Sequence, residues 1–176
     1  MAKKIKVTKA QKKKLSKSWL GIVIILLIGG YNLYQDYKPI NKGERFQVEL
    51  EKTVDGDTAW FNIDGERTKV RFLYIDTPES TKVVEPYGKE ASNYTANLLT
   101  NASKIELELN VDGDTKDKYD RLLAWVFVDG ELLQEKLAQE GLVKKFYDYG
   151  ADYTYKKEII KADQEAKENK RGIYKK

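Results

Sequence analysis

Neither cysteine nor histidine occurs in the 176 residues of the chain. Without cysteine the protein has no disulfide bond, no thiolate nucleophile and no zinc-thiolate site. Without histidine it lacks the commonest general base in proteins. Acid-base catalysis would therefore use carboxylates, lysines or tyrosines, and a metal site would be built from oxygen ligands. Oxygen ligands favour calcium, magnesium or manganese.

Acidic residues are missing from positions 1–18, which hold eight lysines. The whole chain has 32 basic and 28 acidic side chains, so the other 158 residues carry 24 basic and 28 acidic groups and a net charge of −4. The total charge of +4 is therefore no argument for nucleic-acid binding. Any site for a polyanion must be a local cluster of basic residues.

An apolar segment without charged residues follows the lysines and begins W-L-G-I-V-I-I-L-L-I-G-G at Trp19. A basic region before an apolar centre predicts a secretory signal or a signal anchor. As a helix, residues 19–34 would be about 24 Å long, slightly short for a bilayer core of ~30 Å. Flanking aromatic residues and the lack of an A-x-A-like cleavage site favour an uncleaved anchor over a signal peptide removed on secretion. The positive-inside rule then places the chain after about Tyr37 outside the cell membrane.

The chain is thereby divided into a basic region (1–18), an anchor (19–34), a short linker (35–43) and one globular domain (44–176). Pro39 and Gly43 in a polar context indicate the linker. The hydrophobic content of 41% is sufficient for a core in a domain of this length.

Alternation of apolar and polar residues predicts strands around 46–50, 58–63, 70–74 and 105–109, and an apolar run predicts a buried fifth strand at 122–128. Helical periodicity predicts helices within 89–101, 131–140 and 155–169. Five short strands with a helix between the third and fourth predict an α+β fold, a small, partly open five-stranded β-barrel of the oligonucleotide-binding type, or OB-fold. The hydrophobic helix of the N-terminal segment would precede it.

Four Asp-Gly steps stand between apolar residues. The pentapeptide V-D-G-D-T occurs twice, at 54–58 and 111–115, and I-D-G-E and V-D-G-E begin at Ile63 and Val128. Asp-Gly between apolar runs predicts a tight hairpin turn in which both central residues have positive φ. The sequence therefore predicts four turns and raises the question of whether one of the identical pentapeptides also has a chemical role.

Three polar clusters could form a functional site. The first is V-R-F-L-Y-I-D-T-P-E-S at 70–80, the second K-D-K-Y-D-R at 116–121 and the third F-Y-D-Y at 146–149. Taken singly, each has an ordinary structural explanation: a turn at Asp-Thr-Pro, a solvated loop, and tyrosines that pack.

Taken in order, V-D-G-D-T, V-R-F-L-Y-I-D-T-P-E, Y-G-K-E-A, D-K-Y-D-R and Y-D-Y resemble the staphylococcal nuclease (thermonuclease) family. The resemblance extends from about Phe46 to Tyr174. It implies an OB-fold enzyme, a monomeric endonuclease that hydrolyses single-stranded or frayed DNA, and RNA, to 3′-phosphate products with Ca²⁺ as cofactor. Together with the anchor, it implies a calcium-dependent nuclease outside the cell membrane.

The resemblance also implies a role for each matching residue. Calcium would be held by Asp57, Asp76 and the backbone carbonyl of Thr77. Glu79 would position or deprotonate the attacking water, and Arg71 and Arg121 would hold the phosphate. Substrate contacts would come from Lys118, Tyr119, Tyr147 and Tyr149.

Asp120 departs from the family pattern, in which glycine stands beside the second arginine. Aspartate tolerates positive φ better than most residues but adds a negative charge near the phosphate. In the repeated pentapeptides, Asp55, Asp112 and Asp114 are expected to shape turns only. The main alternative is a non-catalytic nucleic-acid or protein-binding module on the same barrel. An EF-hand at 112–117 is excluded, because Lys116 and Asp117 stand where an oxygen ligand and glycine are needed.

Overall fold

The computed structural model describes residues 19, 21–28, 40–81 and 83–175, in two units, 1–40 and 41–176. In the first unit residues 19 and 21–28 are helical. The predicted basic region lies outside the described residues, as do part of the predicted anchor and most of the linker. Within the described part of the chain, no helix combines the length and the hydropathy needed to cross a membrane.

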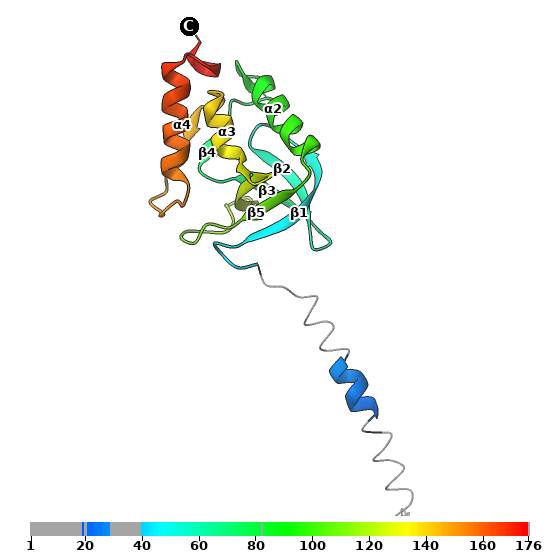
Figure 1. Ribbon diagram of the computed structural model, residues 1–176. Helices are drawn as coiled ribbons and strands as arrows, with labels where there is room; N and C mark the ends of the chain where they lie inside the picture. Colours follow the sequence, from blue (N-terminus) through cyan, green and yellow to red (C-terminus); the bar gives the residue numbers. More distant parts are fainter. Residues whose placement is uncertain (1–18, 20, 29–39, 82, 176) are drawn as a thin grey trace, which may run out of the picture. The chain divides into compact units, whose positions relative to one another are not determined.

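The second unit is a β-barrel with three α-helices at one end (Figure 1). Its strands are β1 (Arg45–Thr53), β2 (Thr58–Ile63), β3 (Glu66–Phe72), β5 (Ile105–Glu108) and β6 (Leu122–Val128). They pair in the order β3-β2-β1-β5-β6, and a parallel pairing of β3 with β6 joins the two ends. The predicted α+β class and OB-type barrel are confirmed, and the barrel closes where the sequence suggested a partly open one.

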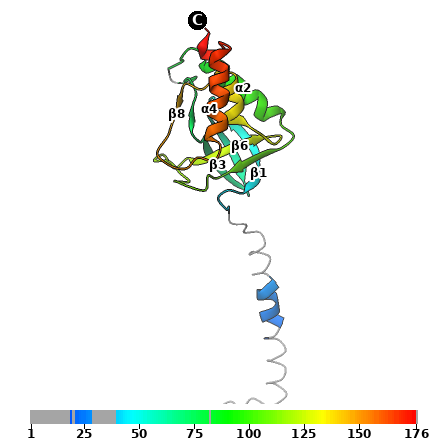
Figure 2. The same cartoon turned by 60° about the vertical axis from the view of Figure 1, so that its left-hand side comes forward.

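The helices are α2 (Gly88–Asn101), α3 (Leu133–Gln139) and α4 (Lys156–Glu168). Helix α3 contacts both α2 and α4, and α2 also contacts β1. A second view shows α4 running beside α3, with β8 (Lys145–Phe146) to one side (Figure 2). Strand β8 pairs with β4 (Ile75–Asp76), and η1 (Gly172–Tyr174) follows α4.

Alternation along the strands places large side chains in one core. Phe61, Val70 and Leu107 have no exposed surface, and neither does Trp125 of the apolar strand β6. The indole Nε1 of Trp125 donates to Asn110 Oδ1 at 3.0 Å, so its polar atom is satisfied. Burial of this apolar surface is the main stabilising contribution to the domain.

One predicted boundary was wrong: the third strand ends at Phe72, because Tyr74 has φ +73° and leaves the ladder. The second helix, Leu133–Gln139, lies within its predicted range. It begins only at Leu133, because Glu131–Leu132 form β7, which pairs with β6 in a hairpin.

The turn prediction is confirmed for two of the four Asp-Gly steps. Asp64 and Gly65 have φ of +50° and +88°, and Asp129 and Gly130 have +51° and +88°. For the pentapeptides the predicted backbone angles are wrong, although the first one does connect the antiparallel strands β1 and β2. Positive φ occurs only at Gly113 in the second and at neither central residue in the first.

Gly56 is required by close packing and not by its backbone angle. A Cβ there would lie 2.5 Å from Thr77 Oγ1 and 2.9 Å from Ala91 Cβ. Its carbonyl accepts a hydrogen bond of 2.7 Å from the buried Thr95 hydroxyl of α2. The first pentapeptide is thus held against α2 and the segment after β4.

Candidate active site

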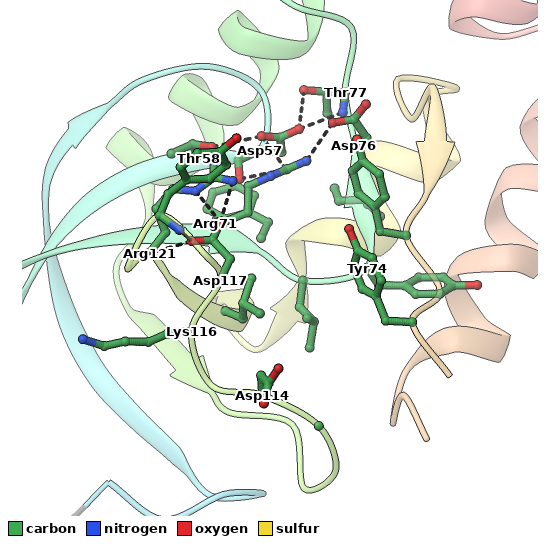
Figure 3. Close-up of a pocket in the computed structure, with 18 of the residues that line it drawn as sticks. Asp57, Thr58, Arg71, Tyr74, Asp76, Thr77, Asp114, Lys116, Asp117 and Arg121 are labelled. Atoms are coloured by element: carbon green, nitrogen blue, oxygen red, sulfur yellow. Dashed lines mark hydrogen bonds and ion pairs between the residues drawn. The ribbon is translucent and has the colours of Figure 1, made fainter. Parts of the chain in front are cut away.

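A cleft of about 840 Å³ opens beside the start of β2, the end of β3 and the short strand β4. The loops 111–121 and 147–153 line it as well (Figure 3). All ten residues predicted for the site line this one cleft: Asp57, Arg71, Asp76, Thr77, Glu79, Lys118, Tyr119, Arg121, Tyr147 and Tyr149. The fold therefore brings together four segments that are up to 92 positions apart in sequence, from Asp57 to Tyr149.

Two carboxylates in the cleft are joined by one guanidinium. Arg71 Nη1 lies 2.5 Å from Asp57 Oδ1, and Nη2 lies 2.7 Å from Asp76 Oδ1 (Figure 3). The side chains of Arg71 and Asp57 are 10% and 8% exposed. Since charges of this burial are stable only when paired and hydrogen-bonded, the three side chains form one structural unit.

Both oxygens of Asp57 accept hydrogen bonds. Thr58 Oγ1 donates to Oδ1 at 3.0 Å, while the Thr77 amide and hydroxyl donate to Oδ2 at 2.8 and 3.1 Å. The carboxylate therefore has one fixed orientation, set by residues of β2 and of the segment after β4. Such preorganisation is what a metal or phosphate site needs.

Asp55 is a third acidic group at this wall, and the sequence reasoning assigned it only to the turn. Its Oδ1 accepts from the Asp57 amide at 3.1 Å, which agrees with a turn role. Burial and the nearby charge of Asp57 raise the pKa of Asp55 to about 6. Burial also raises the pKa of Asp76, although the Arg71 charge opposes this. The pentapeptide V-D-G-D-T does not itself predict this burial, because the identical second copy is exposed.

The cleft supplies some, but not all, of the oxygen ligands that a hard divalent cation needs. Asp57, Asp76 and the Thr77 carbonyl supply oxygen ligands of the kind that calcium and magnesium accept. Among residues 40–81 and 83–175, however, no three acidic side chains converge on one point as a complete metal cage would require. Water or substrate oxygens would have to complete the coordination, as they do for ions that bind jointly with phosphates.

Glu79 is held at the mouth of the cleft by a turn. Its Oε1 accepts hydrogen bonds from the Ser80 amide at 3.1 Å and from the Thr81 amide and hydroxyl at 2.9 and 2.5 Å. Its carbonyl packs on α2 so closely that a Cβ on Gly88 would lie 2.1 Å from the oxygen. The Glu85 carboxylate also holds this turn, because it accepts hydrogen bonds from the Glu79 amide and from Lys144 Nζ.

Asp117 positions Arg121, and sequence reasoning missed it as a site residue. Asp117 Oδ2 accepts from Arg121 Nε at 2.7 Å, while Oδ1 accepts from the backbone amides of Tyr119 and Arg121. Burial by itself would raise the pKa of Asp117, but the hydrogen bonds and charge of Arg121 outweigh it and hold the pKa below its usual value. The D-x-x-x-R spacing was the available signal.

Asp120 has φ +61°, so the residue that replaces the family glycine does adopt the left-handed conformation. Its carboxylate points to solvent, with the side chain 82% exposed, and pairs with Lys116 at 2.8 Å. The added negative charge is therefore partly neutralised by its neighbour.

Four tyrosine and lysine side chains form the outer part of the cleft. Tyr147 and Tyr149 stack with ring centroids 5.8 Å apart and planes 7° from parallel. Across the cleft, Lys118 Nζ lies 5.0 Å from the Tyr119 ring centroid. Tyr119 and Tyr149 are 68% and 79% exposed, so their rings are accessible to a flat ligand group.

The second pentapeptide forms a loop that is tied to the start of α4. Asp112 Oδ2 accepts from the Asp152 amide at 2.9 Å, and this and the Gly113 amide lower the pKa of Asp112. The Asn110 side chain bridges the Asp112 and Asp152 carbonyls at 3.0 and 2.9 Å. Asp114 is exposed and lies apart from the Asp57–Arg71–Asp76 group (Figure 3).

Comparison with known proteins agrees with the resemblance. A family model described as staphylococcal nuclease homologue matches residues 69–176. The SPbeta prophage-derived endonuclease YokF of Bacillus subtilis (strain 168) is 43% identical over 136 residues, 76% of this chain and 45% of the relative. Endonuclease YncB of the same strain is 40% identical over 139 residues, 77% of this chain and 65% of the relative. A thermonuclease of Staphylococcus hyicus is 40% identical over 126 residues, 70% and 72% of the two chains. The chain thus spans less than two thirds of the length of the two Bacillus relatives.

Proposed function

The chain belongs to the staphylococcal nuclease family, and we propose that it is a metal-dependent nuclease that hydrolyses phosphodiester bonds of DNA and RNA. The observation that carries the proposal is the pairing of Asp57, Arg71 and Asp76 in the wall of a cleft that Glu79 and Arg121 also line. A module that only binds nucleic acid has no need of acidic side chains facing a polyanion.

Arg71 and Arg121 are suited to hold the phosphate. Each is a forked donor fixed by an acidic partner, Arg71 by Asp57 and Asp76, and Arg121 by Asp117. Preorganised guanidinium groups stabilise the negative charge that develops on the phosphate oxygens during hydrolysis. A lysine could supply the charge but not the planar, two-point contact.

Glu79 is the group proposed to orient and deprotonate the attacking water. It lines the cleft on the segment that directly follows Asp76 and Thr77, and the turn at 79–81 holds its Oε1. In a protein without histidine, a carboxylate is the expected base.

We propose Ca²⁺ as the cofactor, held by Asp57, Asp76 and the Thr77 carbonyl. When bound there it would supply Lewis-acid activation of the phosphate. Lys118 and Tyr119 would contact substrate phosphates, and the stacked Tyr147 and Tyr149 would contact the nucleotide base.

We further propose that the enzyme acts outside the cell membrane as a monomer, anchored by its N-terminal segment. Eight lysines followed by an apolar segment support the anchor. Cell fractionation tests it: membrane recovery with protease access from outside is expected, and recovery only in the medium would favour secretion after cleavage.

The activity is tested with the full chain and a labelled single-stranded DNA substrate. Calcium-dependent cleavage that a chelator abolishes is expected, together with a loss of kcat on the order of 10³-fold for Glu79→Gln. Glu158→Gln on the exposed face of α4 is the matched control and leaves kcat unchanged. Cleavage insensitive to both chelator and Glu79→Gln would contradict the mechanism, and binding without cleavage would support the binding-module alternative.

A further inference from the structure

A row of basic side chains continues from Arg71 along the outer face of the barrel. Residues Ala59 and Phe61 of β2 and Val70 of β3 face the core without exposed surface, so the alternate positions face outward. On β3 these positions are Arg67, Lys69 and Arg71. They follow one another at intervals of about 7 Å along the strand, and the last one lies in the cleft.

Neighbouring strands widen this row. Lys52 of β1 and Lys69 of β3 are the direct cross-strand partners of Trp60 on β2, one on each side. Arg67 and Lys69 both approach the indole, with Arg67 Cζ 4.5 Å and Lys69 Nζ 5.7 Å from its centroid. Thr58 of the cleft is the next outward residue on β2 and pairs with Arg71. The outward positions of β2 and β3 therefore lead from this surface to Thr58 and Arg71, which line the cleft.

The charge of this surface contrasts with that of the domain. Residues 19–176 carry a net charge of −4, but the cross-strand row nearest the cleft holds Lys52, Trp60 and Lys69 and no acid. Acidic side chains appear one row farther out, where Glu49 and Glu51 stand near Arg67, and Glu51 pairs with Arg67 at 2.7 Å. The Arg67 side chain remains 56% exposed despite this pairing.

We propose that Lys52, Trp60, Arg67 and Lys69 form a second binding surface for single-stranded nucleic acid, which holds the part of the strand that extends beyond the cleft. Cations at regular intervals match the regular phosphates of an extended strand, and an aromatic side chain among them offers a contact to a base or sugar. The proposal deepens the proposed function, because it assigns to the same enzyme a preference for substrates longer than the cleft.

The test compares long and short ligands. Full-length protein and the double variant Arg67→Gln/Lys69→Gln are titrated with a labelled 20-nucleotide single strand and with a dinucleotide, in chelator so that no cleavage occurs. The matched control is Lys161→Gln/Lys167→Gln, which removes the same charge from exposed positions of α4. Cleavage of both ligands is measured separately with calcium.

For the 20-nucleotide strand, the double variant is expected to lose about tenfold in affinity and to reduce the slope of log K against log salt by about 1.4, which is two contacts at about 0.7 each. Dinucleotide affinity and kcat are expected to stay unchanged, because Arg71 and Arg121 are intact. The control variant is expected to match the wild type within about twofold, since only screened long-range charge is lost.

Equal affinity of the double variant and the control for the long strand would overturn the proposal, as would no binding of the long strand by wild type. An equal loss for the dinucleotide would also overturn it, because the residues would then belong to the cleft itself. Absence of cleavage by wild type with a retained difference in binding would reject the proposed nuclease function and leave the second surface standing.

Discussion

Asp57 and Asp114 occupy the same position in two identical pentapeptides, but their surroundings differ. Asp57 is 5% exposed and accepts hydrogen bonds from Thr58 and Thr77 in addition to its ion pair with Arg71. Asp114 is exposed at the other side of the cleft. The difference arises from what packs on each loop and not from the five residues.

Asp55 and Asp112, the first acidic residues of the two pentapeptides, also differ, because their pKa values are shifted in opposite directions. Burial and the charge of Asp57 raise the pKa of Asp55 to about 6, while backbone hydrogen bonds lower the pKa of Asp112. The glycines differ as well, since Gly56 is buried against Thr77 and Gly113 has φ +81°. Making the same substitution at the matching position of each loop therefore separates the effect of the motif from the effect of its surroundings.

The largest difference is expected between Asp57→Asn and Asp114→Asn. Asp57→Asn removes a charge from the proposed calcium site and from Arg71, so kcat for DNA cleavage should fall on the order of 10³-fold. Asp114→Asn should change kcat by less than about threefold, because an exposed charge is screened. Thermal unfolding verifies that both variants fold. Similar losses for both would remove the distinction between the loops.

Glycine substitutions are expected to separate the loops by stability. Gly56→Ala forces a Cβ to within 2.5 Å of Thr77 Oγ1 and should lower the free energy of unfolding by about 3 kcal/mol. Gly113→Ala places alanine at φ +81° and should cost about 1 kcal/mol. Denaturant titration measures both values. A larger cost at Gly113 would show that backbone conformation matters more than packing here.

The pH dependence of stability should differ in sign between the two preceding acids. Because the pKa of Asp55 is raised, its folded form holds a proton that the unfolded chain loses, and stability falls as pH rises from about 4 to 6. Asp55→Asn should therefore stabilise the protein above pH 6. The lowered pKa of Asp112 contributes stability above its unfolded pKa, which is lost as pH falls, so Asp112→Asn should destabilise the protein at neutral pH.

Thermal midpoints measured from pH 4 to 8 in chelator check this pair of predictions. Chelator is needed because a cation bound beside Asp55 would change the pKa of Asp55. A stabilisation by Asp112→Asn, or a destabilisation by Asp55→Asn above pH 6, would contradict the assignment of buried and exposed loops.

The smallest effect is expected from Asp120→Asn at the end of the second loop. Asparagine tolerates φ +61° and removes a charge that is 82% exposed and paired with Lys116. The KM for single-stranded DNA should fall by about twofold at low salt and not at ~150 mM, because exposed charges are screened. A change above tenfold at both salt concentrations would show that Asp120 acts directly on Arg121.

Much of the fold could be predicted from local pattern. Strand β2 and strand β6 lie where alternation and the apolar run placed them, and α4 follows its periodicity within two residues. Tyr74 was misassigned because its φ of +73° takes it out of the strand, and Glu131 belongs to a short strand that pairs with β6 and not to the helix that follows. The ten site residues were predicted from the order of the motifs along the chain, and the fold brings all ten to one cleft.

Other site features had a weak local signal or none. The D-x-x-x-R spacing was the one signal for Asp117, but its hydrogen bonds to Arg121 depend on the folded turn. Asp55 is half-buried although its copy Asp112 is exposed. The basic residues Arg67, Lys69 and Arg71 alternate along one strand, which the sequence alone could indicate. Their position next to the cleft depends on the register between β3 and β2, which only the structure shows.

The sequence by itself determined the chemistry that is possible: without cysteine or histidine, metal ligands must be oxygen atoms, and acid-base catalysis must use carboxylates, lysines or tyrosines. It also determined the five barrel strands and the three helices of the domain, because their periodicity is local. Only the tertiary structure decided which V-D-G-D-T is part of the cleft. The physical reason is that burial, ion pairing with Arg71 and close contact of Gly56 with Thr77 all come from residues distant in the chain.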